Sequence, residues 1–192
     1  MKKKRITVAV SGASGSIYAR LLVQCLMASD AADVTMIFTA NGKEVMEQEE
    51  GVAWLEPYRD RLRVVGNRDF GCSVASGSGR DEAMVVVPCS VGMLSRIATG
   101  QSDDLISRGA DVMLKERRRL ILVVRETPLN LIHLRNMVQL TEAGGIVLPA
   151  APSFYRVPQH IEELCMSVVG RVLSLLGIGS GEAGWGESTP EK

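Results

Sequence analysis

Small and hydroxyl-bearing residues follow the first apolar run of the sequence and could bind an anion. The segment SGASG at 11–15 comes directly after the apolar residues 6–10 and opens a helical pattern. The first amides of a helix lack partners and carry partial positive charge, which suits a phosphate group. The segment lacks both the GxGxxG spacing and the lysine of a P-loop. By itself it predicts either a phosphate site or a tight turn that binds nothing.

Polar residues also follow the next three apolar runs. Thr39 and Ser90 each end one run, and Arg125 stands beside Glu126 directly after five apolar residues. A lone Thr or Ser at such a position is typical of a helix cap. The charged pair is less ordinary, because it must be desolvated on one side unless it serves a ligand.

These residues together predict a site for a phosphorylated cofactor. The carboxyl ends of parallel strands meet at one edge of a sheet, so the hydroxyls, the guanidinium and the helix N-terminus are expected to lie together there. The sequence has neither the glycine fingerprint nor the acidic ribose ligand of an NAD site. A mononucleotide such as FMN therefore fits better.

Two further segments have an ordinary structural interpretation and a functional one. After the last apolar run, the two prolines of 149–155 stiffen a loop that carries Phe154 and Tyr155. These aromatic residues could contact a ligand, or they could be a core Phe and an edge Tyr. The basic segment 115–119 is typical of a solvated helix end.

Five short, mostly continuous apolar runs predict the strands that position these residues. They span 5–10, 34–39, 83–88, 120–124 and 145–149, with a weak sixth candidate at 62–65. Continuous apolar runs are typical of parallel strands covered on both faces, and the alternating order of strands and helices favours a doubly wound open sheet. We expect a three-layer α/β/α architecture.

Helical periodicity fills the gaps between the runs. It predicts a helix at 16–27, two helices within 91–119 joined near 100–103, and an amphipathic helix at 161–176. The Gly, Ser and Glu rich tail at 177–192 cannot bury much apart from Trp185. We therefore predict one domain at 1–176 followed by a tail at 177–192.

Composition excludes several classes of protein. The chain has 192 residues, 46% of them hydrophobic, which suits one domain. Its 22 basic and 22 acidic residues give no net charge to attract nucleic acid. No apolar run approaches the roughly 20 residues of a membrane helix, and the run behind the basic start is too short for a signal peptide. The four cysteines are too widely spaced for a disulfide framework or a zinc site. A cytoplasmic protein is expected.

Several segments, in order, resemble the UbiX-type flavin prenyltransferases, from about Arg5 to Trp185. They are SGASG at 11–15, PCS at 88–90, RGADV at 108–112, LKERR at 114–118, RETPL at 125–129, IHL at 132–134, NM at 136–137 and FY at 154–155. The resemblance implies a flavodoxin-like, Rossmann-like fold that binds reduced FMN. It also implies transfer of a dimethylallyl group from dimethylallyl phosphate to N5 and C6 of the flavin. The prenylated FMN would serve a UbiD-type decarboxylase, and the chain would form a homododecamer with each site at a junction of subunits.

The resemblance implies FMN contacts in four segments. The residues are Gly12, Ala13 and Ser14, then Thr39, then Ser90, Val91, Gly92 and Met93, and finally Arg125. Ser14 would hydrogen-bond near flavin N5. Met93 stands where the family commonly has a small hydroxyl residue, so one hydrogen bond to the flavin is lost or replaced by packing.

The resemblance also implies a site for the prenyl phosphate. Its residues are Arg108, Lys115, Glu126, Tyr155 and Arg171, with Trp185 closing the pocket. Cations stabilise the charge that develops on phosphate as the allylic bond breaks, so the reaction needs no metal. Glu126 or the released phosphate is the candidate base that removes the C6 proton. There is no DDxxD motif, and Asp103-Asp104 is expected to cap a helix.

Two other functions remain as alternatives. An FMN-dependent decarboxylase of the cysteine-peptide type would carry a histidine early in the first helix, where this chain has Ser16-Ile17-Tyr18. A non-catalytic flavin carrier would not need the charges of Lys115, Arg125, Glu126 and Arg171. The sequence leaves open whether the donor is a monophosphate or a diphosphate.

Overall fold

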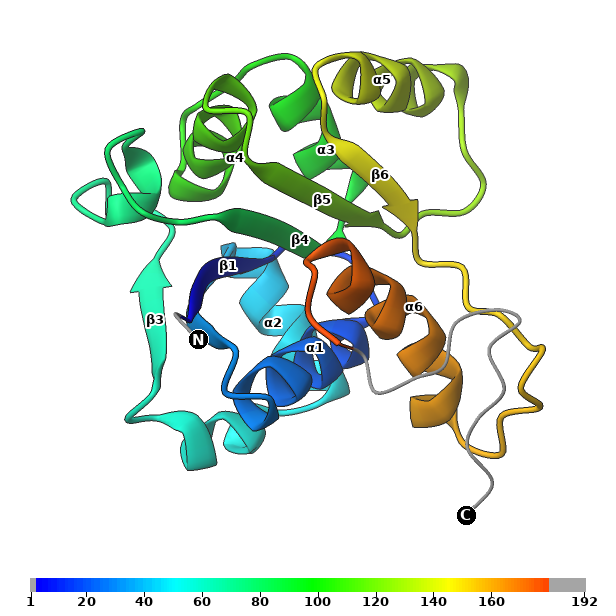
Figure 1. The fold of residues 1–192 in the computed structure, drawn as a ribbon. Coiled ribbons are helices and arrows are strands. Elements are labelled where there is room, and N and C mark those ends of the chain that lie inside the picture. The colour runs from blue at the N-terminus through cyan, green and yellow to red at the C-terminus, as the bar shows by residue number, and fades with distance from the viewer. Residues whose placement is uncertain (1–2, 180–192) are drawn as a thin grey trace.

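Six parallel strands form the single sheet of the computed structural model, which describes residues 3–179 (Figure 1). They are β1 (Lys4–Val10), β2 (Ala32–Phe38), β3 (Leu62–Gly66), β4 (Ala83–Cys89), β5 (Arg119–Val124) and β6 (Ile146–Pro149). Their order across the sheet is β3-β2-β1-β4-β5-β6, that of a doubly wound Rossmann-type fold. Without the edge strand β3 it is the flavodoxin-like order, so the predicted fold class is confirmed.

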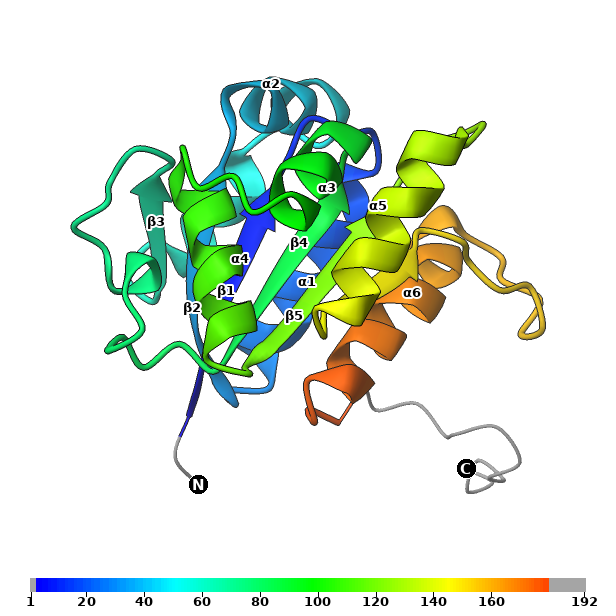
Figure 2. The same cartoon turned by 90° about the horizontal axis from the view of Figure 1, so that it is seen from above.

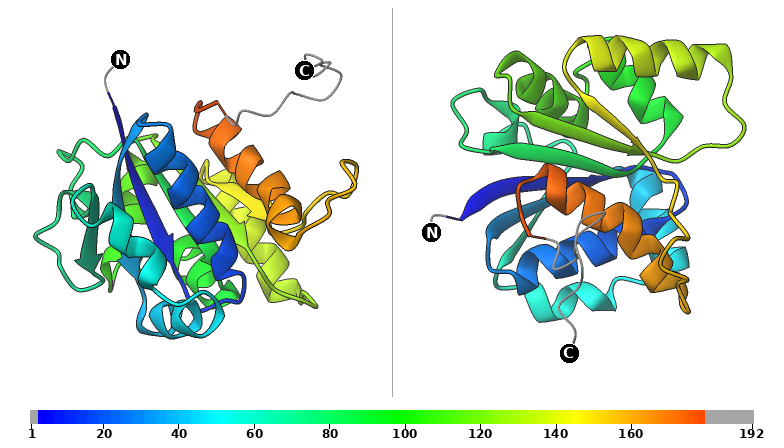
Figure 3. Two further views of the ribbon diagram at one scale, coloured as in Figure 1. Left: turned by 90° about the horizontal axis from the view of Figure 1, so that it is seen from below. Right: turned by 45° about the vertical axis from the view of Figure 1, so that its right-hand side comes forward.

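Helices cover both faces of this sheet (Figures 2 and 3). They are α1 (Ser16–Ala28), α2 (Ala40–Glu49), α3 (Val91–Ala98), α4 (Leu105–Lys115), α5 (Leu131–Glu142) and α6 (Ile161–Leu175), with short 3-10 turns η1 (Ala53–Tyr58) and η2 (Ser73–Ala75). One core cluster contains residues of α1, α2 and α6, and the other contains residues of α3, α4 and α5.

Burial on both faces explains the unbroken apolar runs. Every residue of β4 is buried. Along β1, Val8 belongs to the cluster under α1 and α6, and its neighbour Ala9 belongs to the opposite cluster. The weak sixth strand is confirmed as the edge strand β3, in which Leu62 is buried and Val64 is 54% exposed. An edge strand buries fewer side chains, which is why its sequence pattern is faint.

Side-chain hydrogen bonds cap the first turns of α2 and α4. The cap of α2 corrects a predicted strand end, and the cap of α4 confirms a prediction. Thr39 was expected to end the second strand, but its hydroxyl accepts a hydrogen bond from the Gly42 amide at 2.9 Å and caps α2. Asp104 caps α4 as predicted, accepting from the Ser107 amide at 2.8 Å.

The other ends of the chain's elements also depart slightly from prediction. The second of the two helices predicted within 91–119 ends at Lys115, because Arg117 adopts a left-handed backbone with φ 56° before β5 begins. At the far end, Ile178 is buried in the core, two residues beyond the predicted domain boundary.

Two further predictions concern the cysteines and membrane-spanning helices. Cys72, Cys89 and Cys165 are buried, Cys25 is half-buried, and none of the four forms a disulfide within residues 3–179. Among the described residues, none of the helices combines the length and apolar character needed to cross a bilayer.

Candidate functional site at the carboxyl edge of the sheet

The ends of β1 and β4 are joined by a serine pair. The hydroxyl of Ser11 is buried, donates to the Pro88 carbonyl at 3.0 Å and accepts from the Ser90 amide at 2.8 Å. These bonds hold the turn after β1 beside the start of α3. Two of the segments predicted to bind FMN are therefore adjacent.

A close approach joins the same turn to the start of α2. A Cβ on Gly12 would lie 2.7 Å from Cβ of Asn41, and one on Gly42 would overlap the Val10 carbonyl. Only glycine at both positions lets the backbones meet at this distance. The third predicted segment, at Thr39, thereby joins the first two.

The start of α3 combines a hydroxyl cap with open amides. The Ser90 hydroxyl accepts from the Met93 amide at 3.2 Å. The amides of Val91 and Gly92 hydrogen-bond to no other described residue and remain available to an anion. The Met93 side chain is buried beneath α3, so packing takes the place of a hydroxyl at this position.

Glu49, at the end of α2, closes the N-terminus of α1. Its carboxylate accepts hydrogen bonds from the amides of Gly15 at 2.9 Å and Ser16 at 2.8 Å. Burial alone would raise the pKa of Glu49, but hydrogen bonds from the Ser14 hydroxyl and from these amides lower it overall. The carboxylate therefore stays charged beside Ser14.

This arrangement corrects the prediction that the first amides of this helix are free for phosphate. The Gly15 and Ser16 amides are already bound to the carboxylate of Glu49. The sequence does not single out Glu49, because it lies among other acidic residues of α2 and nothing in their spacing shows which one reaches α1. The first turn of α1 contains no acidic residue of its own, so its positive N-terminus can attract a carboxylate from elsewhere in the chain. This is the only signal in the sequence that points to a residue such as Glu49.

Tyr18 connects α1 to α6 below this edge. Burial, and then contact with Cys165, raise the pKa of Tyr18 to about 12, although the positive charge of Arg125 opposes the shift. The tyrosine is therefore uncharged at neutral pH, and Arg125 lies close enough to act on it electrostatically. Arg125 is the last of the four predicted FMN contact segments, and it therefore lies near the start of α1.

Arg125 and Glu126 are exposed in the single chain. The Arg125 amide donates to the Cys89 carbonyl at 3.0 Å, which places its backbone beside the end of β4. Its guanidinium makes no hydrogen bond or ion pair with any residue in 3–179, and Glu126 only accepts from the Thr127 amide at 2.9 Å. Both side chains reach solvent, so the apolar strand before them does not desolvate the pair, and its service to a ligand stays a prediction.

The loop after β6 brings aromatic side chains to the same edge. Phe154 and Tyr155 are 68% and 79% exposed. The amide of Ser153 donates to the Ser167 hydroxyl at 3.0 Å, which ties the loop to α6. The alternative of a core Phe is excluded, because both rings stand on the surface.

Three predicted residues do not reach this edge within one chain. Arg108 donates to the Ala75 carbonyl at 3.0 Å and pairs with Asp111. Lys115 ends α4 beside Glu116, near the amino ends of the strands, and Arg171 is exposed on the later part of α6. Trp185 lies outside the described residues.

The residues at the edge fit FMN by their chemistry. Open helix amides and a guanidinium suit a phosphate, and the glycine contacts let a ligand approach the backbone. Within the described part of the chain, no three His, Cys, Asp or Glu side chains gather to hold a metal.

The chain is similar to proteins whose family is known. The model of the Flavoprotein family matches residues 1–173. A protein of Methanocaldococcus jannaschii named flavin prenyltransferase UbiX is 44% identical over 174 residues, covering 91% of this chain and 94% of the relative. Its namesake in Pseudomonas aeruginosa is 43% identical over 189 residues, covering 91% and 90%.

Solved structures show the same similarity. AnUbiX (PadA1), crystallised with FMN and dimethylallyl pyrophosphate, has a TM-score of 0.88 at 39% identity, covering 96% of this chain and 100% of that one. A dodecameric FMN-dependent UbiX-like decarboxylase from Escherichia coli O157:H7 has a TM-score of 0.88 at 32% identity, covering 94% and 98%. A PPC decarboxylase, at 16% identity and a TM-score of 0.66, shares the fold.

Proposed function

The chain belongs to the family of UbiX-type flavin prenyltransferases, and we propose that it transfers a dimethylallyl group from dimethylallyl phosphate to N5 and C6 of reduced FMN. The product is prenylated FMN. The observation that carries the proposal is the convergence of all four predicted FMN segments on one edge of the sheet, through Ser11 and Ser90, Gly12 and Asn41, and Arg125.

Reduced FMN supplies the nucleophilic N5 and C6 positions. The amides of Val91 and Gly92 and the guanidinium of Arg125 hold its phosphate or its polar ring edge. Gly12 and Ala13 provide a backbone surface without bulky side chains. These contacts orient the flavin and cover one side of it. Holding one substrate in a fixed orientation lowers the entropic cost of its reaction with the second substrate.

Ser14 and Glu49 form the polar contact nearest the reacting nitrogen. The Ser14 hydroxyl lies near the Glu49 carboxylate, so it can donate to that carboxylate and still keep lone pairs to accept a hydrogen bond. Reduced flavin carries a hydrogen on N5, so the pair can accept it and hold the proton that leaves. Glu49 thus joins the predicted catalytic residues Ser14 and Glu126.

Cationic side chains act on the prenyl donor. Lys115, Arg108 and Arg171 neutralise the phosphate as the allylic C–O bond breaks, the task that a divalent metal performs in other prenyl transfers. Tyr155 adds a hydroxyl to the same group. Glu126, exposed and without a cationic partner among residues 3–179, accepts the C6 proton.

The complete site requires a second copy of the chain. Lys115 lies at the opposite edge from Arg125, so one chain cannot bring both to one ligand. An apolar face on α5 is available for assembly, since Leu131, Ile132 and Val138 are 59%, 66% and 57% exposed. We propose a homododecamer with the site at a junction of subunits, as in the dodecameric relative.

The proposal includes a recipient for the product. Prenylated FMN is useful only to an enzyme that binds it as a cofactor, and a UbiD-type decarboxylase is the proposed recipient. The cytoplasm is the proposed location. The cysteine-peptide type of decarboxylase is disfavoured, because Ser16, Ile17 and Tyr18 stand where it needs a histidine in α1.

The test is an anaerobic reaction of the purified protein with reduced FMN and dimethylallyl phosphate, followed by mass spectrometry of the released flavin. We expect one added five-carbon unit per flavin without added metal. A parallel reaction with dimethylallyl diphosphate identifies the preferred donor. Bound FMN that stays unmodified with both donors contradicts the proposal and favours the decarboxylase or carrier alternatives.

A further inference from the structure

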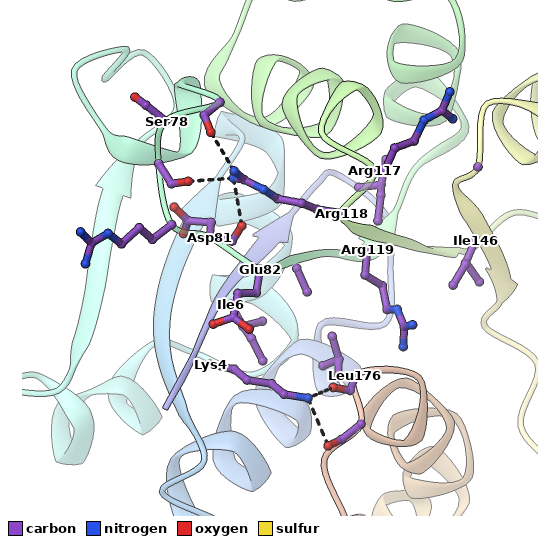
Figure 4. Close-up of a pocket in the computed structure, with 17 residues that line it drawn as sticks. Lys4, Ile6, Ser78, Asp81, Glu82, Arg117, Arg118, Arg119, Ile146 and Leu176 are labelled. Carbon is purple, nitrogen blue, oxygen red and sulfur yellow. Dashed lines mark hydrogen bonds between the residues drawn. The ribbon is translucent and has the colours of Figure 1, made fainter. Parts of the chain in front are cut away.

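One arginine holds the loop between η2 and β4 in place. Arg118 lies in the turn between α4 and β5, and its guanidinium donates to the carbonyls of Gly77 at 2.7 Å, Gly79 at 2.8 Å and Asp81 at 3.1 Å (Figure 4). Its side chain is only 23% exposed. Three charge-assisted hydrogen bonds from one planar group fix both the path of a loop and the direction of its carbonyls.

Among residues 3–179, the other contacts that anchor this loop lie at its two ends. At one end the Ala75 carbonyl accepts from Arg108 at 3.0 Å. At the other, the buried Asp81 carboxylate accepts from the hydroxyls of Thr7 at 3.2 Å and Ser73 at 3.1 Å. Apart from bonds within 73–80, every hydrogen bond that residues 76–80 make to the described chain comes from Arg118.

The pinned loop touches Lys115. A Cβ on Gly77 would lie 2.6 Å from Nζ of Lys115 and would also overlap the Glu116 carboxylate. A Cβ on Gly79 would overlap the Ser73 carbonyl. The loop therefore lies directly against both the ammonium group and the Glu116 carboxylate that pairs with it, and it limits where the ammonium group can stand.

We propose that Arg118 is a positioning residue for prenyl transfer. It holds the loop at 77–81 against Lys115 and so places the ammonium group for the phosphate of the prenyl donor. It also neutralises three carbonyl oxygens that would otherwise add negative potential beside that phosphate. This inference rests on the proposed function of Lys115.

The informative variant is Arg118→Lys, which keeps the charge but loses the planar fork. The matched control is Arg117→Lys, because the Arg117 side chain has no hydrogen bond or ion pair within 3–179 and points away from the loop (Figure 4). Gly77→Ala is a second test, because it pushes Lys115 aside and leaves Arg118 intact. Three quantities are measured: amide hydrogen exchange at 76–81, KM and kcat with dimethylallyl phosphate, and FMN affinity.

For Arg118→Lys we expect about tenfold faster exchange in the loop and about a tenfold higher KM for the prenyl donor, with kcat and FMN affinity within about twofold of wild type. Gly77→Ala should raise the same KM, and Arg117→Lys should change nothing. An unchanged KM overturns the inference. So does a rise in KM that is matched by equal losses of kcat and FMN affinity. If the wild type forms no adduct, the proposed function fails, and loop exchange still shows whether Arg118 holds the loop.

Discussion

Glu49 Oε2 accepts a hydrogen bond from the Ser16 amide at 2.8 Å, so a carboxylate from α2 closes the N-terminus of α1. The Ser14 hydroxyl lies near the same carboxylate and helps to lower the pKa of Glu49. One side chain thereby stabilises the helix dipole and orients the residue proposed to face flavin N5. Stability and activity should both depend on it.

Replacing Glu49 with Gln removes the charge and keeps the shape. We expect the free energy of unfolding to fall by about 1 kcal/mol, since a charged acceptor at a helix N-terminus is lost. Prenyl transfer should slow by about tenfold while FMN still binds. Urea denaturation and single-turnover kinetics measure the two effects. Glu44→Gln, at an exposed position of α2, is the control, and an equal response from both variants would contradict the role of Glu49.

The same carboxylate predicts a pH dependence of stability. The folded chain lowers the pKa of Glu49 below its ordinary value of 4.5, so the unfolded chain binds the proton more readily. Its stabilisation is complete above 4.5 and disappears as the pH falls through the lowered pKa. The difference in unfolding free energy between wild type and Glu49→Gln should therefore shrink steadily below pH 4.5. A difference that grows on acidification would show that the sign is wrong.

The contact between Gly12 and Asn41 predicts sensitivity to one methyl group. Gly12→Ala places a Cβ about 2.7 Å from Cβ of Asn41, so the turn after β1 and the start of α2 must move apart. FMN affinity should fall by about tenfold in a fluorescence titration. Gly66→Ala is the control, because a Cβ there meets nothing within 4 Å. Equal affinities for both variants would separate this contact from FMN binding.

The sequence predicts which residues lie at the carboxyl ends of the strands, but it does not predict which polar residues of a helix face the site. Ser11, Ser90 and Arg125 follow apolar runs, and parallel strands bring such positions to one edge by topology alone. Glu49 reaches the same edge through the rotation of a helix with several acidic residues. Hydrophobic periodicity fixes the buried side of such a helix and leaves the direction of its polar residues undetermined.

The predicted prenyl phosphate residues show a second limit. The resemblance to the family identified Lys115 and Arg108 as cations for the prenyl phosphate. Their distance from Arg125, however, depends on the direction in which α4 crosses the sheet. Only the fold shows that Lys115 lies at the opposite edge. A site divided between copies of a chain leaves no pattern in the spacing of one sequence.

An ion-pair group on the helix layer predicts a stability effect away from the site. Arg20, 16% exposed, binds Glu50 and also Glu162 at 2.6 Å, joining α1 to the end of α2 and the start of α6. Arg20→Gln leaves Glu50 half-buried without its partner, and should lower the unfolding free energy by about 1–3 kcal/mol. Lys43→Gln, which breaks an exposed pair with Glu47, should cost less than about 0.5 kcal/mol. Similar losses in urea denaturation would contradict this ranking.

The division of the site between subunits predicts recovery of activity on mixing two inactive variants. Lys115→Ala removes the cation from one edge of each chain, and Glu126→Gln removes the base from the other edge. If a site takes Glu126 from one copy and Lys115 from its neighbour, mixed assemblies contain some sites in which both residues are intact.

Random assortment of equal amounts, after dissociation and reassembly, restores roughly a quarter of the sites, because each of two independent positions is wild type half the time. Each variant alone should be inactive, and mixing without reassembly is the control. Activity is measured as prenylated flavin formed per protomer. A reassembled mixture that stays inactive would place Lys115 and Glu126 of the same chain in one site, which the fold of the single chain does not allow without a large movement of α4.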